Sequence, residues 1–171
     1  EKILTKTLKM KKNSLLILFL TVFTIVSCDS ERIYDEYITL PESSWNKSNA
    51  ITFNFSVKDS INKKNLFINL RNNNDYNYSN LFLITQINFP DGQVIIDTLE
   101  YGMADVTGKF LGEGFSAIKE NKLFYKVNIV FPYTGEYTFK VKQAMRKNGN
   151  IEGIEDLEGI SQVGFRIEKT E

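Results

Sequence analysis

Residues 51–58 read ITFNFSVK, and this stretch decides the fold class of the chain. Apolar side chains occupy every second position, at Ile51, Phe53, Phe55 and Val57, and polar side chains occupy the positions between them. A period of two places the two kinds of side chain on opposite faces of a β-strand. The stretch therefore predicts a strand that has one face in a core and the other in solvent.

Similar strands are expected on both sides of this one. They cover residues 65–71, 81–89, 94–99, 123–131, 137–146 and 163–167. Polar turns separate them, and Pro90-Asp91-Gly92 is typical of a tight hairpin. Residues 81–89 are apolar on both faces, which favours a position in the middle of a sheet. Together, about seven to nine strands without an amphipathic helix predict an all-β fold, an antiparallel β-sandwich.

Three segments are less regular. Residues 101–114 contain four glycines and predict turns and bulges. Residues 115–122 predict a single helical turn, and residues 147–159 predict an acidic loop. Trp45, the only tryptophan, is expected to fill one end of the core because a buried aromatic ring removes a large area from water. Stacking of Trp45 on a ligand is the alternative.

Residues 10–28 read MKKNSLLILFLTVFTIVSC and are typical of a bacterial secretory signal. Two lysines precede an apolar run that is shorter than the roughly 20 residues that a membrane-spanning helix needs. The run ends in Ile25-Val26-Ser27-Cys28, which resembles the lipobox of bacterial lipoproteins. In a lipobox the cysteine is acylated, for example with palmitate, and becomes the mature N-terminus. We therefore expect Cys28, the only cysteine, to be lipid-modified and to hold the protein to a membrane.

This signal sets the expected domain boundaries. Residues 1–27 form an upstream extension and signal peptide with Met10 as the expected start, residues 28–45 the lipidated N-terminus and tether, and residues 46–171 the β-sandwich domain. The whole chain has 21 basic and 21 acidic residues; without residues 1–27 it has 16 and 20, a net charge of −4. A mildly acidic domain does not fit a nucleic-acid partner, which selects a basic face.

The residue types that are present argue against catalysis. The sequence contains no histidine, which removes the commonest general base and the commonest metal ligand. Asp97, Glu100 and Asp105 could supply the carboxylate pair of a glycosidase, but no supporting motif accompanies them. The acidic residues within 152–158 lack the spacing of a calcium loop and predict a solvated loop. We expect no enzyme, no metal site and no cofactor.

Six segments together resemble one family of bacterial proteins. They are RNNNDY at 71–76, SNLFL at 79–83, DTLEY at 97–101, LGEGFS at 111–116, QAMR at 143–146 and VGFRI at 163–167. With the lipobox, and in this order, they resemble the gliding-motility lipoprotein family GldH. The resemblance implies a membrane-anchored lipoprotein of the cell envelope that is required for gliding. It also implies an association with the type IX secretion system that exports the motility adhesins, and it carries over no catalytic residue.

Two functions stay open on the sequence alone. The first is a non-catalytic component that binds other gliding and secretion proteins of the envelope. Its candidate surface is the stretch 71–80, because this connection is longer than a hairpin needs. The candidate partner-binding residues are Arg71, Tyr76, Tyr78 and Asn80. The alternative is a lipid-anchored carbohydrate-binding module of the cell surface, with sugar-stacking rings drawn from Trp45, Tyr76 and Tyr78. The location, on the periplasmic side or in the outer membrane, also stays open.

Overall fold

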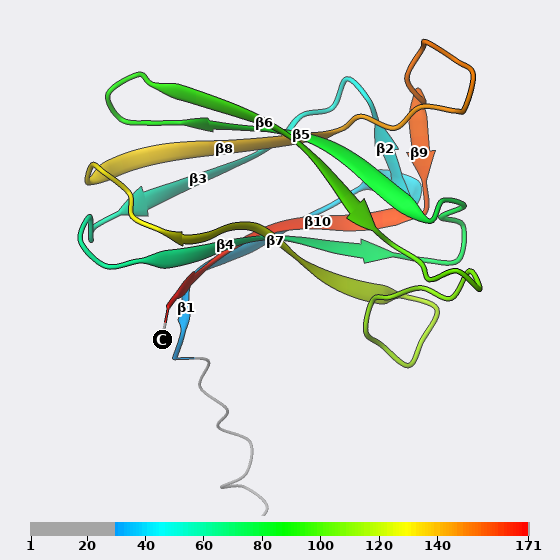
Figure 1. Cartoon of the computed structure of the whole chain (residues 1–171), viewed down its shortest axis with the longest axis horizontal. Coiled ribbons are helices and arrows are strands. Elements are labelled where there is room, and N and C mark those ends of the chain that lie inside the picture. The colour runs from blue at the N-terminus through cyan, green and yellow to red at the C-terminus, as the bar shows by residue number, and fades with distance from the viewer. Residues whose placement is uncertain (1–29, 171) are drawn as a thin grey trace, which may run out of the picture. The chain divides into compact units, whose positions relative to one another are not determined.

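The computed structural model describes residues 30–170 of the chain. These residues form ten strands and one short 3-10 turn (Figure 1). The elements are β1 (Arg32–Thr39), η1 (Pro41–Ser43), β2 (Ser44–Asn46), β3 (Ile51–Val57), β4 (Lys64–Asn72), β5 (Asn80–Asn88), β6 (Val94–Gly102), β7 (Lys119–Ile129), β8 (Gly135–Gln143), β9 (Asp156–Glu158) and β10 (Ile160–Lys169). The expected signal segment and Cys28 lie outside the described residues. Within residues 30–170, no helix has both the length and the hydropathy needed to span a bilayer.

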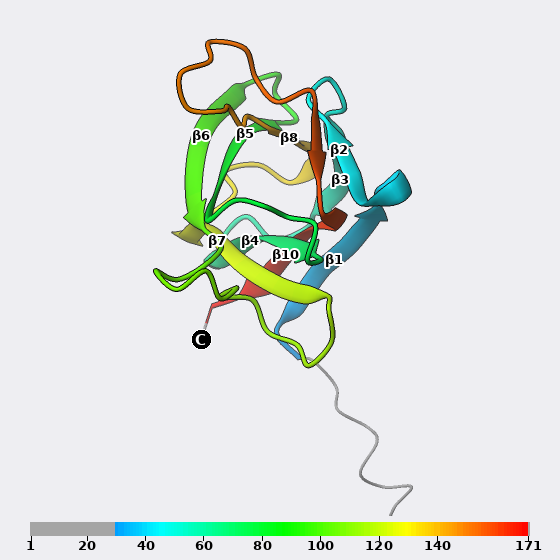
Figure 2. The ribbon, with the colours of Figure 1, turned by 90° about the vertical axis from the view of Figure 1, so that its right-hand side faces the viewer.

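Eight of the strands form two antiparallel four-stranded sheets. The first sheet has the order β1-β10-β4-β7, and the second has the order β3-β8-β5-β6. Figure 2 shows the two sheets as two layers that face each other, which is the arrangement of a β-sandwich. The short strands β2 and β9 pair with each other at one end of the sandwich. The predicted all-β sandwich is confirmed, with two three-residue strands that raise the count above the expected seven to nine.

The core lies between the inward faces of the two sheets and is rich in aromatic rings. Phe55 of β3 and Phe139 of β8 meet Phe165 of β10, with ring centroids 5.4 Å and 4.1 Å apart. Such contacts contribute about 0.5–1.5 kcal/mol each beyond the area that they bury. Trp45 is fully buried at one end, where its Nε1 donates a hydrogen bond of 2.9 Å to the carbonyl of Asn49. The prediction that Trp45 fills the core is confirmed.

The sandwich has two ends that differ in what they carry. At the end where the chain enters β1 lie the connections 58–63, 89–93 and 130–134 together with the end of β10. We call this the entry end. At the opposite end, the far end, lie the connections 73–79, 103–118 and 144–155. The connection 73–79 crosses from the first sheet to the second, so it is longer than a hairpin turn because it spans the two layers.

Most strand predictions are confirmed by the structure. β3 covers residues 51–57 with strictly alternating burial, and β5 and β6 form the hairpin expected around Pro90-Asp91-Gly92. Gly92 has a φ of +88°, a left-handed conformation that favours glycine in such a turn. β5 lies between β8 and β6, inside its sheet, as its apolar faces indicated.

The region before and within β7 differs from the prediction. Residues 115–117 are bends rather than a helical turn, and β7 begins at Lys119. The expected inward alternation also fails within the strand. Two register shifts interrupt the pairing with β4, one on each side of the pair Leu66 and Lys126, and Asn128 adopts a φ of +55°. Val127, which an unbroken alternation from Leu123 would place in the core, is therefore 51% exposed, because one extra residue in a strand reverses the face of the residues that follow.

The structure also forms strands in two segments that the sequence analysis did not assign to a sheet. β1 is an edge strand paired with β10 along nearly its whole length, and the compact unit that contains it begins at Glu31. The end of the acidic loop forms β9, whose Leu157 pairs with Trp45 in β2. Both pairings join residues more than a hundred positions apart, which local sequence patterns do not reveal.

Candidate functional site

The connection 73–79 is built by the hydrogen bonds of its own polar side chains. The Oδ1 of Asn73 accepts a bond of 2.9 Å from the N–H of Asp75, and its Nδ2 donates to the carboxylate of Asp75 at 3.0 Å. The Nδ2 of Asn77 donates to the carbonyl of Asp75 at 2.8 Å. These bonds are typical of asparagine-rich turns, and they explain the composition of the segment without a partner.

Tyr76 points into the core and is only 2% exposed. Its hydroxyl donates a hydrogen bond of 2.7 Å to the carbonyl of Asn80, and burial raises its pKa well above the ordinary value. Gly159, with a φ of +87°, packs so closely that a Cβ there would lie 2.1 Å from the backbone nitrogen of Tyr76. Tyr78 is half-buried and meets the Tyr76 ring edge-on, with centroids 5.7 Å apart. Tyr76 therefore anchors the connection to the core.

Arg71 lies on the outer face of the first sheet, where it is the centre of a polar cluster. Its Nε and Nη2 donate to one carboxylate oxygen of Glu120 at 3.1 Å and 3.0 Å, and its Nη1 donates to Gln162 at 2.6 Å. The guanidinium lies 4.7 Å from the centre of the Tyr37 ring. The Tyr37 hydroxyl donates to the other oxygen of Glu120 at 2.7 Å. This Arg71 cluster of Tyr37, Arg71, Glu120 and Gln162 spans all four strands of the sheet.

The structure therefore separates residues that the sequence analysis grouped. Arg71 is on the outer face of a sheet, Tyr76 is in the core, and Asn80 donates a hydrogen bond of 2.9 Å to Glu100 on β6. Trp45 and Tyr76 are both buried, so neither presents a ring to a sugar. Partner binding by the exposed part of this region stays a prediction.

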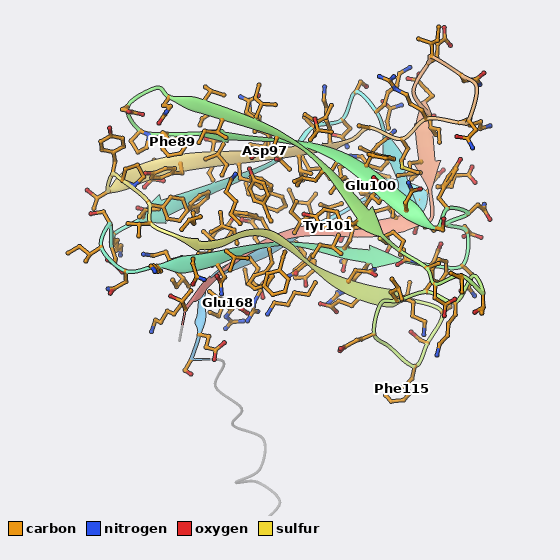
Figure 3. All side chains as sticks on the ribbon, in the orientation of Figure 1. Phe89, Asp97, Glu100, Tyr101, Phe115 and Glu168 are labelled. Atoms are coloured by element: carbon orange, nitrogen blue, oxygen red, sulfur yellow. The ribbon has the colours of Figure 1, made fainter. Side chains whose placement is uncertain are left out.

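One exposed apolar segment was missed by the sequence analysis. The connection 103–118 carries exposed Val106, Leu111 and Ile118 and the fully exposed Phe115. Figure 3 shows Phe115 at the tip of this connection, pointing away from the sandwich. A pocket of about 940 Å³ lies between Leu111, Phe115 and the Glu120 of the Arg71 cluster. We call Leu111, Phe115 and Ile118 the Phe115 surface.

The signal for this surface is present in the sequence but is weak. Phe115 follows Gly112 and Gly114, and an apolar residue in a glycine-rich turn has few neighbours to bury it. The expected helical turn at residues 115–122 would have allowed Phe115 to pack against the fold, so the sequence did not predict an exposed ring.

The three carboxylates considered for glycosidase chemistry do not form a pair. Asp97 accepts hydrogen bonds from the Tyr125 hydroxyl at 2.7 Å and forms an ion pair with Lys126 at 2.9 Å. Burial alone would raise the pKa of Asp97, but these partners outweigh it and lower the pKa. Glu100 lies three positions along the same strand and so faces the opposite side, and Asp105 caps its own turn.

The acidic loop is held by contacts within the fold. Glu155 forms an ion pair with Lys47 at 2.6 Å, and Asp156 accepts a hydrogen bond from Asn46 at 2.8 Å. In the part of the chain that the structure describes, no three acidic, cysteine or histidine side chains gather as metal ligands. The remaining acidic residues of the loop, Glu152 and Glu158, are exposed to solvent.

Comparison with known proteins finds close relatives over nearly the whole chain. The family model described as GldH lipoprotein matches residues 32–167. A protein of Christiangramia forsetii named "Gliding motility lipoprotein GldH homolog" is 53% identical over 156 residues, which cover 90% of this chain and 95% of that protein. The "Gliding motility lipoprotein GldH" of Flavobacterium johnsoniae is 49% identical over 153 residues, which cover 90% and 94%.

Among solved structures, the VP2 subviral particle of infectious bursal disease virus is similar with a TM-score of 0.39 and 14% identity. The similarity covers 83% of this chain and 34% of the viral protein, so this chain spans about a third of its length. So distant a likeness carries no functional argument.

Proposed function

The chain belongs to the GldH lipoprotein family, and from that membership we propose that it acts in gliding by binding other envelope proteins. It is a gliding-motility lipoprotein anchored to a membrane of the cell envelope. Its proposed role is that of a non-catalytic component of the gliding apparatus and of the type IX secretion machinery associated with it. The observation that carries this proposal is the identity of about half of all residues with gliding-motility lipoproteins, along nearly their full length.

The proposed anchor is a lipid, for example palmitate, on Cys28. In this proposal residues 1–27 are removed and residues 28–31 form a short tether to β1. Two features support it: the lipobox Ile25-Val26-Ser27-Cys28 and the lipoprotein family itself. Lipid on one cysteine can hold a folded domain stably when more than one acyl chain is attached.

A non-catalytic role is supported by the residues that the fold brings together. The chain has no histidine, and its candidate carboxylates Asp97, Glu100 and Asp105 are each engaged in separate contacts. The strongest shifts of pKa within residues 30–170 belong to tyrosines that are buried or hydrogen-bonded, and to Asp59 in a turn. Such shifts follow from structural contacts and need no catalytic role.

The proposed partner-binding surface is the far end of the first sheet. There the Arg71 cluster and the Phe115 surface meet at Glu120, which lines the pocket beside Phe115. Exposed apolar side chains next to an arginine are typical of protein interfaces, because aromatic and arginine side chains dominate binding energy. Tyr78 and Asn80 stay candidate contacts at the same end, whereas Tyr76 supports the connection from within the core.

The test is complementation of a Flavobacterium johnsoniae strain that lacks its own relative. We expect this chain to restore colony spreading, and we expect R71A together with F115S to abolish it while the protein still reaches the membrane fraction. The matched controls are I151S, which removes an exposed apolar residue of another far-end loop, and E152A with E155A in the acidic loop. Both controls should glide.

Two results would count against this proposal. Normal spreading of the R71A and F115S variant would show that partners bind elsewhere. A lower melting temperature of that variant, with loss of protein from the envelope, would show that Arg71 and Phe115 stabilise the fold rather than bind a partner.

A further inference from the structure

An apolar pocket of the described chain lies at the entry end. It has a volume of about 740 Å³ and lies between the start of β1, the connection 58–63 and the end of β10. Its inner wall is apolar and includes Phe55, Phe131 and Ile167, which also belong to the core. No residue of this pocket takes part in the far-end surface described above.

The mouth of the pocket exposes two large aliphatic side chains. Ile61 at the tip of the connection is 83% exposed, and Ile33 at the start of β1 is 44% exposed. A pair of exposed isoleucines beside an apolar pocket is an arrangement that favours contact with an apolar phase or partner. Both side chains are continuous with the apolar inner wall.

The connection that carries Ile61 is held in one conformation from within. Lys64 is buried, and its Nζ donates to the carbonyl of Asp59 at 2.8 Å, to its carboxylate at 3.1 Å and to the carbonyl of Asn62 at 2.9 Å. The carboxylate of Asp59 also accepts bonds from the N–H groups of Ile61 and Asn62, which hold its pKa far below the ordinary value. Lys64 and Asp59 therefore neutralise each other.

The rim of the pocket keeps a positive charge. Lys58, Lys63 and Lys169 all line the pocket and are exposed. None of the three has an ion-pair partner among residues 30–170. The mature chain carries a net charge of −4, so a cationic rim is opposite in sign to the molecule as a whole. Local charge of this kind selects an anionic ligand.

Chain length places this rim close to a membrane. Three residues lie between Cys28 and Arg32, the first residue of β1, so the two Cα atoms are four chain steps apart. Because an extended chain spans at most about 3.5 Å per residue, a lipid on Cys28 holds the start of β1 within about 14 Å of the bilayer surface. Ile33 follows Arg32 directly and lines the pocket.

We propose that the entry-end pocket binds an anionic phospholipid of the membrane in which the protein is anchored. The headgroup phosphate contacts Lys58, Lys63 and Lys169, and the apolar part of the lipid contacts Ile33, Ile61 and the wall behind them. The location of this ligand rests on the lipid anchor proposed above for Cys28, whereas its chemistry rests on the pocket. Bound in this way, the sandwich stands with its far end away from the bilayer and open to partners.

The test uses the processed lipoprotein in vesicles, with a polarity-sensitive thiol fluorophore on I61C or, as the far-end control, on I151C. One set of vesicles is phosphatidylcholine and the other is phosphatidylcholine mixed with phosphatidylglycerol. We expect the emission of the I61C probe to shift to the blue in the mixed vesicles, and the emission of the I151C probe to be the same in both. If the fluorophore also labelled the wild-type chain, the thiol of Cys28 would be free. That result would contradict the proposed lipid anchor and not the proposed pocket.

Charge reversal separates the pocket from the anchor. Each lysine close to an anionic membrane surface strengthens binding about fivefold, so loss of the three lysines in K58E/K63E/K169E should weaken the response to phosphatidylglycerol by at least about 100-fold. The matched control is K142E/R146E/K147E, three exposed basic residues of the far end, which should leave the shift intact. Both triple variants should melt at the temperature of the parent.

Three outcomes would overturn the proposal. The first is equal emission from the I61C and I151C probes in mixed vesicles. The second is a shift caused by inorganic phosphate without vesicles, which would mark a site for free anions. The third is a shift that appears only in whole envelopes and not in lipid vesicles, which would mark a protein ligand.

Discussion

The sequence around Tyr76 predicts a binding residue, whereas its position in the fold gives it a structural role. It lies in a polar connection with the residue types of a turn, yet its ring is in the core and its hydroxyl is bonded to the carbonyl of Asn80. The backbone of Tyr76 lies so close to Gly159 that a Cβ at position 159 would collide with it.

Truncation of Tyr76 should therefore destabilise the sandwich. We expect Y76A to lower the free energy of unfolding by about 3–5 kcal/mol, because a large buried ring is lost and a cavity remains. Y76F should cost only about 1 kcal/mol, the net contribution of one hydrogen bond. Denaturant unfolding measures both, and Y133A is the control, since Tyr133 is an exposed tyrosine. A Y76A variant as stable as the parent would place the ring outside the core.

Glu168 makes the stability of the first sheet depend on pH. Glu168, labelled in Figure 3, is buried on the first sheet. Its carboxylate accepts hydrogen bonds from Lys122 at 2.7 Å and from Arg166 at 2.5 Å. Burial would raise its pKa, but the bonds from these two cations outweigh burial and hold the pKa below the ordinary value of 4.5. The ionised form is therefore stabilised by folding.

A carboxylate whose pKa is lowered by folding stabilises the fold above its unfolded pKa. The contribution of Glu168 should be complete at neutral pH and should disappear as the pH falls below about 4.5 towards the lowered value. We expect E168Q to lose about 2 kcal/mol at pH 7, and the difference from the parent to shrink in acid. Unfolding curves between neutral and acid pH measure this, and a difference that does not change with pH would contradict it.

At the scale of elements, β7 is the strand in which pattern and structure differ most. Its existence follows from the alternation of apolar residues, but the two register shifts between Phe124 and Ile129 change which side chains face the core. Tyr125 faces inward and bonds to Asp97, whereas Val127 faces solvent. Period-two patterns assume an unbroken ladder, and a bulge depends on the partner strand as well.

This difference gives a direct test of the strand's register. We expect V127K to change the free energy of unfolding by less than about 0.5 kcal/mol, because the side chain is exposed. V141K, at a buried position of β8, should prevent folding because it places an unpaired charge in the core. Circular dichroism and thermal melts distinguish the two. A V127K variant that unfolds would show that Val127 faces the core, as an unbroken alternation predicts.

At the scale of the whole molecule, the sandwich has two different ends, and the lipid anchor that we propose on Cys28 precedes the strand that begins at the entry end. The chain enters at the entry end, and the long connections with exposed apolar residues lie at the far end. In this proposal the sheet pair between the two ends holds the far-end loops at a distance from the lipid anchor. Loops held by a rigid scaffold are where binding residues are most often found.

Loss of the anchor should leave this scaffold intact. We expect C28S to remove the protein from the membrane fraction or to leave an unprocessed precursor, and gliding should stop. Cell fractionation measures the location, and limited proteolysis of the recovered protein should still yield a resistant fragment that begins near residue 31, the start of the folded unit. A mature C28S protein that stays on the membrane would show that another contact holds it.

Sequence alone determined the features that depend on neighbours in the chain. The two-residue period of 51–57 and the Pro90-Asp91-Gly92 turn follow from backbone geometry, so the β-sandwich and its central hairpin could be predicted. The family was also predictable, because its segments are read in order along the chain. The same holds for the absence of histidine, which limits the chemistry that the protein can perform.

Only the tertiary structure decided which residues lie together. Arg71 and Tyr76 are five positions apart, yet one is on an outer face and the other in the core, because the chain leaves one sheet for the other between them. The entry-end pocket joins side chains from four separate segments, and β9 pairs with a strand more than a hundred residues away. These contacts are set by the packing of two sheets against each other, and no local pattern in the sequence encodes a partner that distant.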